Sequence, residues 1–133
     1  IMPSVKNALF ENIHQSDPLD FWSKHGLDYR RVTDFLDLDT NALSKLGGVS
    51  KKSVRLDDRI PQDLKERLEQ IANICALVAE YFEGDAEKTA LWFKTPNPTL
   101  GEVTPRDMIR YGRYRKLIKF ITKSREENVA RGA

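Results

Sequence analysis

The chain has 133 residues, enough for one compact domain or two small subdomains that share a core. Hydrophobic residues make up 40% of it and charged residues 32%, which is typical of a folded chain with many exposed helix faces and excludes a disordered one. No apolar run reaches the length of a membrane span and no signal peptide opens the chain, so we expect no membrane partner. The single cysteine, Cys75, excludes an internal disulfide and is consistent with a cytoplasmic protein.

The net charge of +2 is unevenly distributed along the chain. Residues 1–85 hold eleven Lys/Arg against fifteen Asp/Glu, whereas residues 86–133 hold eleven against five. The excess of positive charge in the C-terminal part indicates contact with an acidic partner, although a solvated helix face would explain it as well.

The first third of the chain predicts short helices. Apolar residues around Leu9 suggest one of them. Asp17 followed by Pro18 is a helix-start signal, and Gly26 would end that helix. Asp28 can cap the next one. Its apolar residues at helical spacing are Tyr29, Val32, Phe35 and Leu36. Since no alternating strand pattern of useful length occurs, we predict an all-α fold.

Residues 40–59 have the spacing of a helix-turn-helix. A small residue, Ser44, precedes Gly48 by four positions, and the aliphatic Val54 follows the glycine by six. Two helices that cross steeply need a small side chain at their contact and a permissive residue at the corner. The segment resembles the DNA-binding half of Xre/Cro-like repressors, with a second helix that begins at Ser50.

A second helix of this kind would enter the major groove by its N-terminal end. The candidate DNA contacts are Ser50, Lys51, Lys52, Ser53 and Arg55. Asp57 and Asp58 would reduce the positive potential, and many such units are plain packing corners. With so few basic residues, DNA binding would require a dimer.

The long segment 61–83 predicts the clearest single helix, which begins after Pro61 and ends before Gly84. Its apolar stripe follows spacings of three and four residues. The stripe consists of Leu64, Leu68, Ile71, Cys75, Val78 and Phe82. Further apolar residues widen it, which favours a helix packed on several neighbours over a coiled coil.

Residues 85–112 predict two helices joined by a stiff bend. Asp85 can cap the first helix and Pro96 ends it. Thr104, followed by a proline, reopens a helix, and Gly112 closes it. The plain interpretation is a helix-loop-helix whose aromatic residues fill the core.

Four short elements within this region carry a resemblance to a known family. They are Ala90-Leu91-Trp92, Thr95-Pro96-Asn97, Leu100-Gly101 and Thr104-Pro105. In this order and spacing they resemble the toxin-binding module of the MbcA/ParS/Xre antitoxins. The resemblance implies three parts: a helical region over 1–60 with the helix-turn-helix at about 40–59, a connecting core helix over 61–84, and a toxin-binding module over 85–133.

The same resemblance implies where a toxin would bind. The candidate toxin contacts are Trp92, Asn97, Arg110, Tyr111, Arg113 and Tyr114. Arginine and tyrosine are also favoured as interface anchors. We expect Met108 and Ile109 to contribute apolar area to this interface. After Gly112 a last, cationic helix is predicted, with Leu117 on its apolar face, followed by a mobile tail beyond about Arg125.

The sequence offers little for catalysis. His14, His25 and one cysteine give no zinc-ligand spacing, and no phosphate-binding glycine loop occurs. We therefore expect no enzyme, no metal and no cofactor.

The resemblance implies an antitoxin of a type II toxin-antitoxin system. Such a protein would neutralise a RES-domain toxin, which consumes NAD, by covering its substrate entry, and would repress its own operon as a homodimer. Two alternatives remain open. The chain could be a solitary helix-turn-helix regulator that uses its C-terminal module to dimerise, or a protein-interaction scaffold that never contacts DNA.

Overall fold

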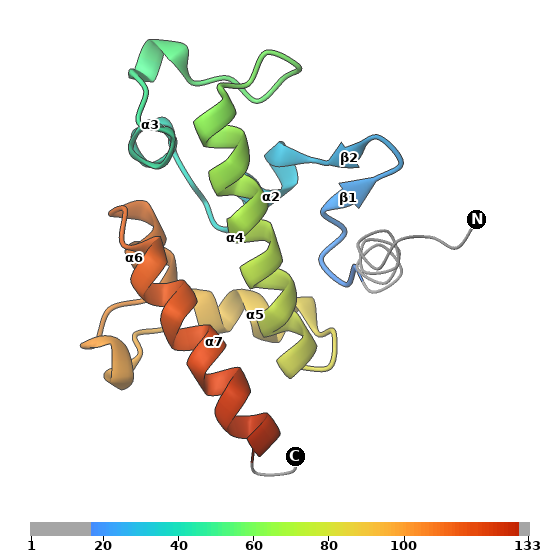
Figure 1. The fold of residues 1–133 in the computed structure, drawn as a ribbon, viewed down its shortest axis with the longest axis vertical. Coiled ribbons are helices and arrows are strands. Elements are labelled where there is room, and N and C mark those ends of the chain that lie inside the picture. The colour runs from blue at the N-terminus through green and yellow to red at the C-terminus, as the bar shows by residue number, and fades with distance from the viewer. Residues whose placement is uncertain (1–16, 131–133) are drawn as a thin grey trace.

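The structure is a computed structural model that describes residues 17–130, and the predicted all-α fold is confirmed (Figure 1). The elements in chain order are β1 (Trp22–Ser23), β2 (Gly26–Leu27), α2 (Tyr29–Phe35), α3 (Thr40–Gly47), the 3₁₀ turn η1 (Lys51–Ser53), α4 (Gln62–Tyr81), α5 (Ala86–Phe93), the 3₁₀ turn η2 (Pro98–Leu100), α6 (Pro105–Arg110) and α7 (Tyr114–Ala130). The helix predicted around Leu9 lies outside the described residues, as does His14.

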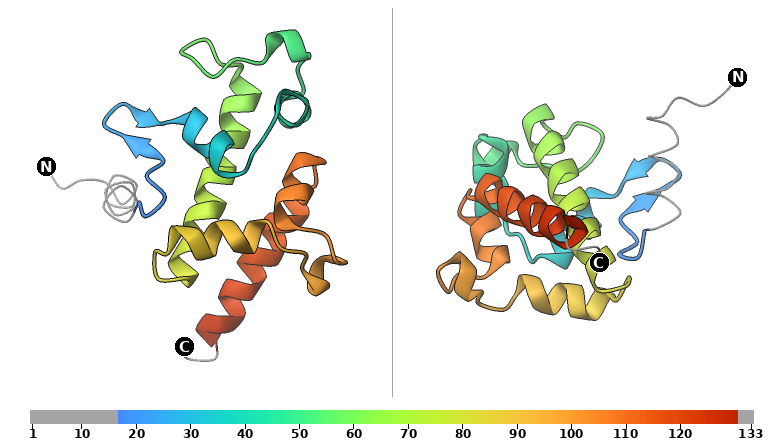
Figure 2. Two further views of the ribbon diagram at one scale, coloured as in Figure 1. Left: turned by 180° about the vertical axis from the view of Figure 1, so that it is seen from behind. Right: turned by 60° about the horizontal axis from the view of Figure 1, so that its bottom comes forward.

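The long helix α4 organises the fold, because α2, α3, α5 and α7 all contact it. Figure 2 shows α5 crossing α4 near its C-terminal end. The predicted apolar stripe accounts for these contacts, since Leu64, Leu68 and Cys75 are fully buried and Ile71 nearly so. With 20 residues, α4 is about 30 Å long at 1.5 Å per residue, long enough to contact segments from both halves of the chain.

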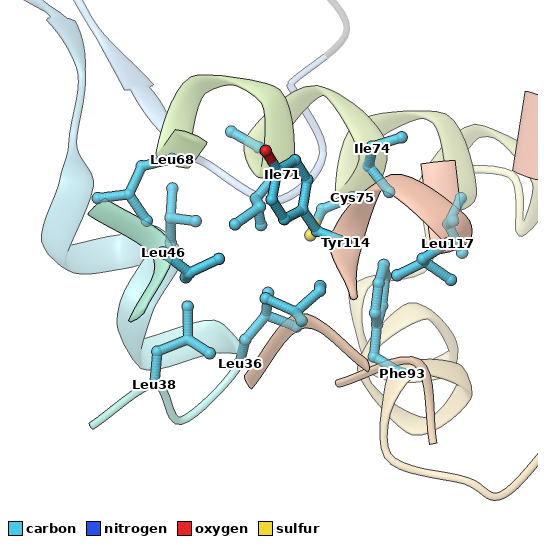
Figure 3. Close-up of a cluster of buried hydrophobic side chains, with 14 of the residues drawn as sticks. Leu36, Leu38, Leu46, Leu68, Ile71, Ile74, Cys75, Phe93, Tyr114 and Leu117 are labelled. Atoms are coloured by element: carbon cyan, nitrogen blue, oxygen red, sulfur yellow. The ribbon is translucent and has the colours of Figure 1, made fainter. Parts of the chain in front are cut away.

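One hydrophobic cluster extends through the described part of the chain (Figure 3). It takes Leu36 from the end of α2, Leu46 from α3, Phe93 from α5 and Leu117 from α7, which gather on the buried side of α4. Segments before and after α4 therefore fold on a common core.

The helix predicted from Asp17 to Gly26 is wrong. The Asp17 carboxylate accepts hydrogen bonds from the N–H groups of Phe21 (3.1 Å) and Trp22 (2.9 Å), four and five residues on. An N-cap would instead bind amides two or three residues on. The chain bends into the short antiparallel pair β1–β2, with Gly26 at a φ of 109°.

The second helix of the predicted helix-turn-helix is also wrong, because only the three-residue turn η1 forms there. Val54 and Leu56 follow it and are both half-buried. Two residues at a spacing of two cannot share one side of a helix, but they do share one face of an extended segment. Burying both selects an extended path between η1 and α4.

The C-terminal helix α7 is longer than predicted and continues to Ala130, so the mobile tail expected beyond Arg125 is helical as far as the structure describes it. Leu117 is 1% exposed and Ile121 8%, which makes this helix part of the core. Within the described residues, no helix is both long enough and apolar enough to cross a membrane.

Candidate functional site

The bend between α5 and α6 is held by side-chain caps and a backbone bridge. Asp85 caps α5 and Thr104 caps α6, through oxygens that accept backbone N–H bonds of 3.0 and 2.9 Å, as predicted. Asn97 and Val103 form an antiparallel bridge with an N–H to carbonyl distance of 3.1 Å. Gly101 reverses the chain between them at a φ of 79°. These contacts fix the course of the backbone from one helix to the next.

The six candidate toxin contacts are Trp92, Asn97, Arg110, Tyr111, Arg113 and Tyr114, and the structure places them in three environments. Trp92 and Asn97 are half-buried and line a groove. Tyr111 and Arg113 are exposed just after α6, next to the partly exposed Arg110. Tyr114 is 8% exposed and belongs to the core.

The exposed Tyr111 closely follows residues of α6 that are buried in the core. Met108 and Ile109, in the preceding turn of α6, are 3% and 1% exposed, so they pack into the core and do not offer the interface area expected of them. Tyr111 itself is 60% exposed. A rigid aromatic side chain on a fixed helix end loses little entropy when a partner covers it.

Helix α3 contacts this end of α6 through charged side chains. The Lys45 ammonium lies 5.8 Å from the centroid of the Tyr111 ring, within the range of a cation–π contact. The Arg110 guanidinium lies 4.0 Å from Asp39, at the start of α3, and 3.4 Å from Asp107 in its own helix. The surface around Tyr111 is therefore built jointly by α3 and α6.

A second set of ion pairs joins the turn before α3 to the bend. The Asp37 carboxylate lies 3.4 Å from the Lys94 ammonium and 3.3 Å from the Arg106 guanidinium. Asp37 is largely exposed, and solvent-exposed pairs contribute little to stability singly. Here one carboxylate is shared by two cations, so the pairs reduce the positive charge of Lys94 and Arg106 only in part.

Tyr114 has a structural role at the start of α7. Its ring centroid lies 5.0 Å from the Arg67 guanidinium of α4, and its hydroxyl accepts a hydrogen bond of 3.2 Å from Arg115 Nε. Its contacts are with this chain, so we expect it to position α7 more than to contact a partner.

A groove of about 800 Å³ opens between the C-terminal part of α4, the end of α5 and the second half of α7. The apolar and aromatic residues that line it are Leu77, Val78, Tyr81, Phe82, Trp92, Phe120 and Ile121. Asn97 and Ser124 add polar groups, and charged residues stand at its rim. The apolar pattern of the sequence predicts most of these residues on the core-facing sides of helices and does not predict the groove.

One signal in the sequence does point to the groove. Tyr81 is one of the further apolar residues that widen the stripe of segment 61–83 beyond one packed face, and it is 70% exposed in the structure. Three large side chains of apolar character stand out as exposed among the described residues, namely Tyr81, Leu91 and Tyr111. Tyr81 ends α4, Leu91 lies in α5 and Tyr111 follows α6.

The candidate DNA contacts lie together around η1. Ser50, Lys51, Lys52, Ser53 and Arg55 are all exposed. Without the predicted second helix, however, they have no recognition helix to place in a major groove. The Ser50 and Ser53 hydroxyls hydrogen-bond each other at 3.0 Å, and no helix cap forms at Ser50.

Arg55 is engaged by a neighbouring carboxylate. Its Nε donates to Asp57 Oδ1 at 2.7 Å, and its second nitrogen pairs with the other oxygen. This side-chain hydrogen bond and the backbone N–H of Arg59 lower the pKa of Asp57 to about 2. Lys51 and Lys52 are therefore the cations of this segment that have no ion pair in the described structure.

The described residues offer no metal-binding cluster of histidine, cysteine or carboxylate side chains. Cys75 is fully buried, and desolvation raises the pKa of its thiol far above the ordinary range, so the thiol stays protonated. His25 is exposed in the β1–β2 turn.

Comparison with known families gives a match to part of the chain. Residues 77–114 match the family model of the antitoxin Xre/MbcA/ParS C-terminal toxin-binding domain. The matched segment runs from the end of α4 through the bend to the first residue of α7. No curated protein and no solved structure matches the chain. The bend is therefore similar in sequence to the toxin-binding domain of Xre/MbcA/ParS antitoxins, and this similarity supports an antitoxin role in a toxin-antitoxin system.

Proposed function

We propose that this protein neutralises a RES-type, NAD-consuming toxin by direct binding. The match of residues 77–114 to a toxin-binding domain carries the proposal. The exposed Tyr111 and Arg113 support it, because their side chains are of the types enriched among interface anchors. In this mechanism the surface after α6 covers the entry to the toxin's substrate site. NAD is then a substrate of the toxin, and this chain needs no cofactor.

Co-expression with the product of the adjacent reading frame tests the proposal. We expect the two proteins to co-purify, and we expect this chain to restore both growth and cellular NAD in cells that express the toxin. Tyr111→Ala combined with Arg113→Glu should weaken the complex about tenfold or more, since interface anchors typically contribute at least that much.

Arg30→Glu is a matched control, because Arg30 is an exposed arginine of α2, outside the matched segment. It should bind and rescue like the wild type. If the wild type fails to bind the adjacent product and fails to restore NAD, the proposal is refuted.

Autoregulation by operator binding as a homodimer is the second part of the proposal. The support is the exposure of Lys51 and Lys52, next to two serine hydroxyls. Because η1 is a single turn, we expect these residues to bind phosphates and not to read bases. A dimer would double the number of phosphates neutralised.

A gel-shift titration with the upstream promoter tests this part. Lys51→Glu with Lys52→Glu should weaken binding and flatten its salt dependence, because fewer counterions are released. Unchanged affinity and an unchanged salt slope would exclude this face. Operator binding together with no toxin binding would instead support a solitary regulator.

A further inference from the structure

The groove between α4, α5 and α7 has an apolar floor that no part of the described chain covers. Leu77, Trp92 and Phe120 line it and are each only half-buried, so part of every side chain faces the groove. Tyr81 stands at its edge with 70% of its surface exposed. Burying such surface against a partner would be favourable.

The groove is closed on one side by a weak contact. The Arg125 guanidinium of α7 lies 3.1 Å from Glu80 of α4, and both side chains are about half exposed or more. Exposed pairs of this kind contribute little, so a partner that displaces this one loses little stability.

The form of the groove favours a helix as its occupant. Two of its walls are the helices α4 and α7, and its floor carries aliphatic and aromatic residues. An amphipathic helix fills such a space with anchors three and four residues apart. Asn97 adds specificity: its side-chain oxygen accepts the N–H of Thr99, which leaves its amide hydrogens to donate to a partner.

The sequence positions of the lining residues indicate which protein would supply the helix that binds in the groove. Seven of the twelve lining residues, Tyr81 and Trp92 among them, belong to segment 77–114, the part similar to a toxin-binding domain. The groove thus lies largely in the segment whose similarity supports toxin binding. A second copy of this chain has no comparable indication.

We propose that the groove receives an amphipathic helix of the toxin, whose apolar face packs on Tyr81, Trp92 and Phe120. This inference rests on the proposed function and adds a second contact area, away from Tyr111. The toxin is held by both areas together.

Substitutions of two exposed side chains test the groove. Tyr81→Ser should raise the Kd for the co-expressed adjacent gene product about tenfold or more. Leu91→Ser is the matched control, because Leu91 is 67% exposed and lies in the same matched segment but does not line the groove. It should bind like the wild type. Equal affinities for Tyr81→Ser and the wild type, or equal losses in both variants, would overturn the proposal.

Site-directed cross-linking identifies the occupant. The only native cysteine, Cys75, is buried, so a thiol-reactive photo-cross-linker labels an introduced cysteine selectively. From Tyr81→Cys we expect cross-links to one toxin peptide with apolar residues at helical spacing, and from Leu91→Cys none. Cross-links between two copies of this chain, or none to the toxin, would refute the assignment.

The two proposals fail in different ways. If the wild type does not bind the adjacent gene product, the antitoxin function and the groove assignment both fall. If the wild type binds, Tyr111→Ala with Arg113→Glu weakens the complex and Tyr81→Ser does not, only the groove assignment falls.

Discussion

Trp92 and Phe93 are neighbours in α5 with different environments. Phe93 is fully buried in the core, whereas Trp92 is half-buried and lines the groove. Their rings meet edge to face, with centroids 5.0 Å apart. The sequence predicts that both rings belong to the apolar side of α5. Which ring faces the interior depends on how α5 is rotated about its axis against α4.

Asp57 offers a residue-level prediction. Its pKa is lowered from 3.8 to about 2, mainly by the hydrogen bond from Arg55. A carboxylate with a lowered pKa in the folded state favours folding above its ordinary pKa, and this contribution disappears as the pH falls towards the lowered value. Arg55→Ala should therefore raise the titration midpoint of Asp57 towards 3.8 in an NMR titration. Lys52→Ala should leave it unchanged, and a midpoint unaffected by Arg55→Ala would contradict the ion pair.

At the scale of secondary-structure elements, the close crossing of α3 over α4 depends on one glycine. A Cβ built on Gly47 would lie 2.8 Å from Leu64 Cβ and 3.3 Å from Leu64 Cα. Real Cβ atoms do not approach so closely, and an atom next to the backbone cannot move aside cheaply. Gly47 is thus the small residue at the contact between α3 and α4.

Gly47→Ala should destabilise the protein. Alanine in a helix normally gains roughly 0.5–1 kcal/mol over glycine, but overpacking typically costs about 1–3 kcal/mol. Denaturant unfolding should therefore show a lower midpoint for this variant. Asn41→Ala, at an exposed position of the same helix, should unfold within about 0.5 kcal/mol of the wild type. A midpoint for Gly47→Ala at or above that of the wild type would exclude the close contact.

At the scale of the whole molecule, α7 belongs to the core and is not a separable arm. Leu117 and Ile121 are buried in the common cluster, so we expect removal of the residues after Gly112 to abolish cooperative folding and, with it, both toxin binding and DNA binding.

A single substitution checks that role without deleting the helix. Leu117→Ala should lower the free energy of unfolding by about 2–5 kcal/mol, as is usual for a buried leucine. Lys119→Ala, at an exposed position two residues on, serves as the control and should change it little. If Leu117→Ala and Lys119→Ala had the same midpoint of thermal unfolding, α7 would not be part of the core.

Several features of this protein follow from its sequence alone, because they depend on neighbours along the chain. The helix α4, the caps at Asp85 and Thr104 and the all-α class all follow from periodicity and start signals, whose cause is local. The resemblance of the bend to a toxin-binding module also lies in contiguous residues, and the match over 77–114 supports it.

Tertiary structure decided the rest. Whether residues after Ser50 form a helix depended on burying Val54 and Leu56 together, a contact with distant parts of the chain that no local signal encodes. The burial of Met108, the exposure of Tyr81 and the groove likewise depend on how α4, α5, α6 and α7 pack. Packing selects one face of each helix, and the sequence specifies only that an apolar face exists.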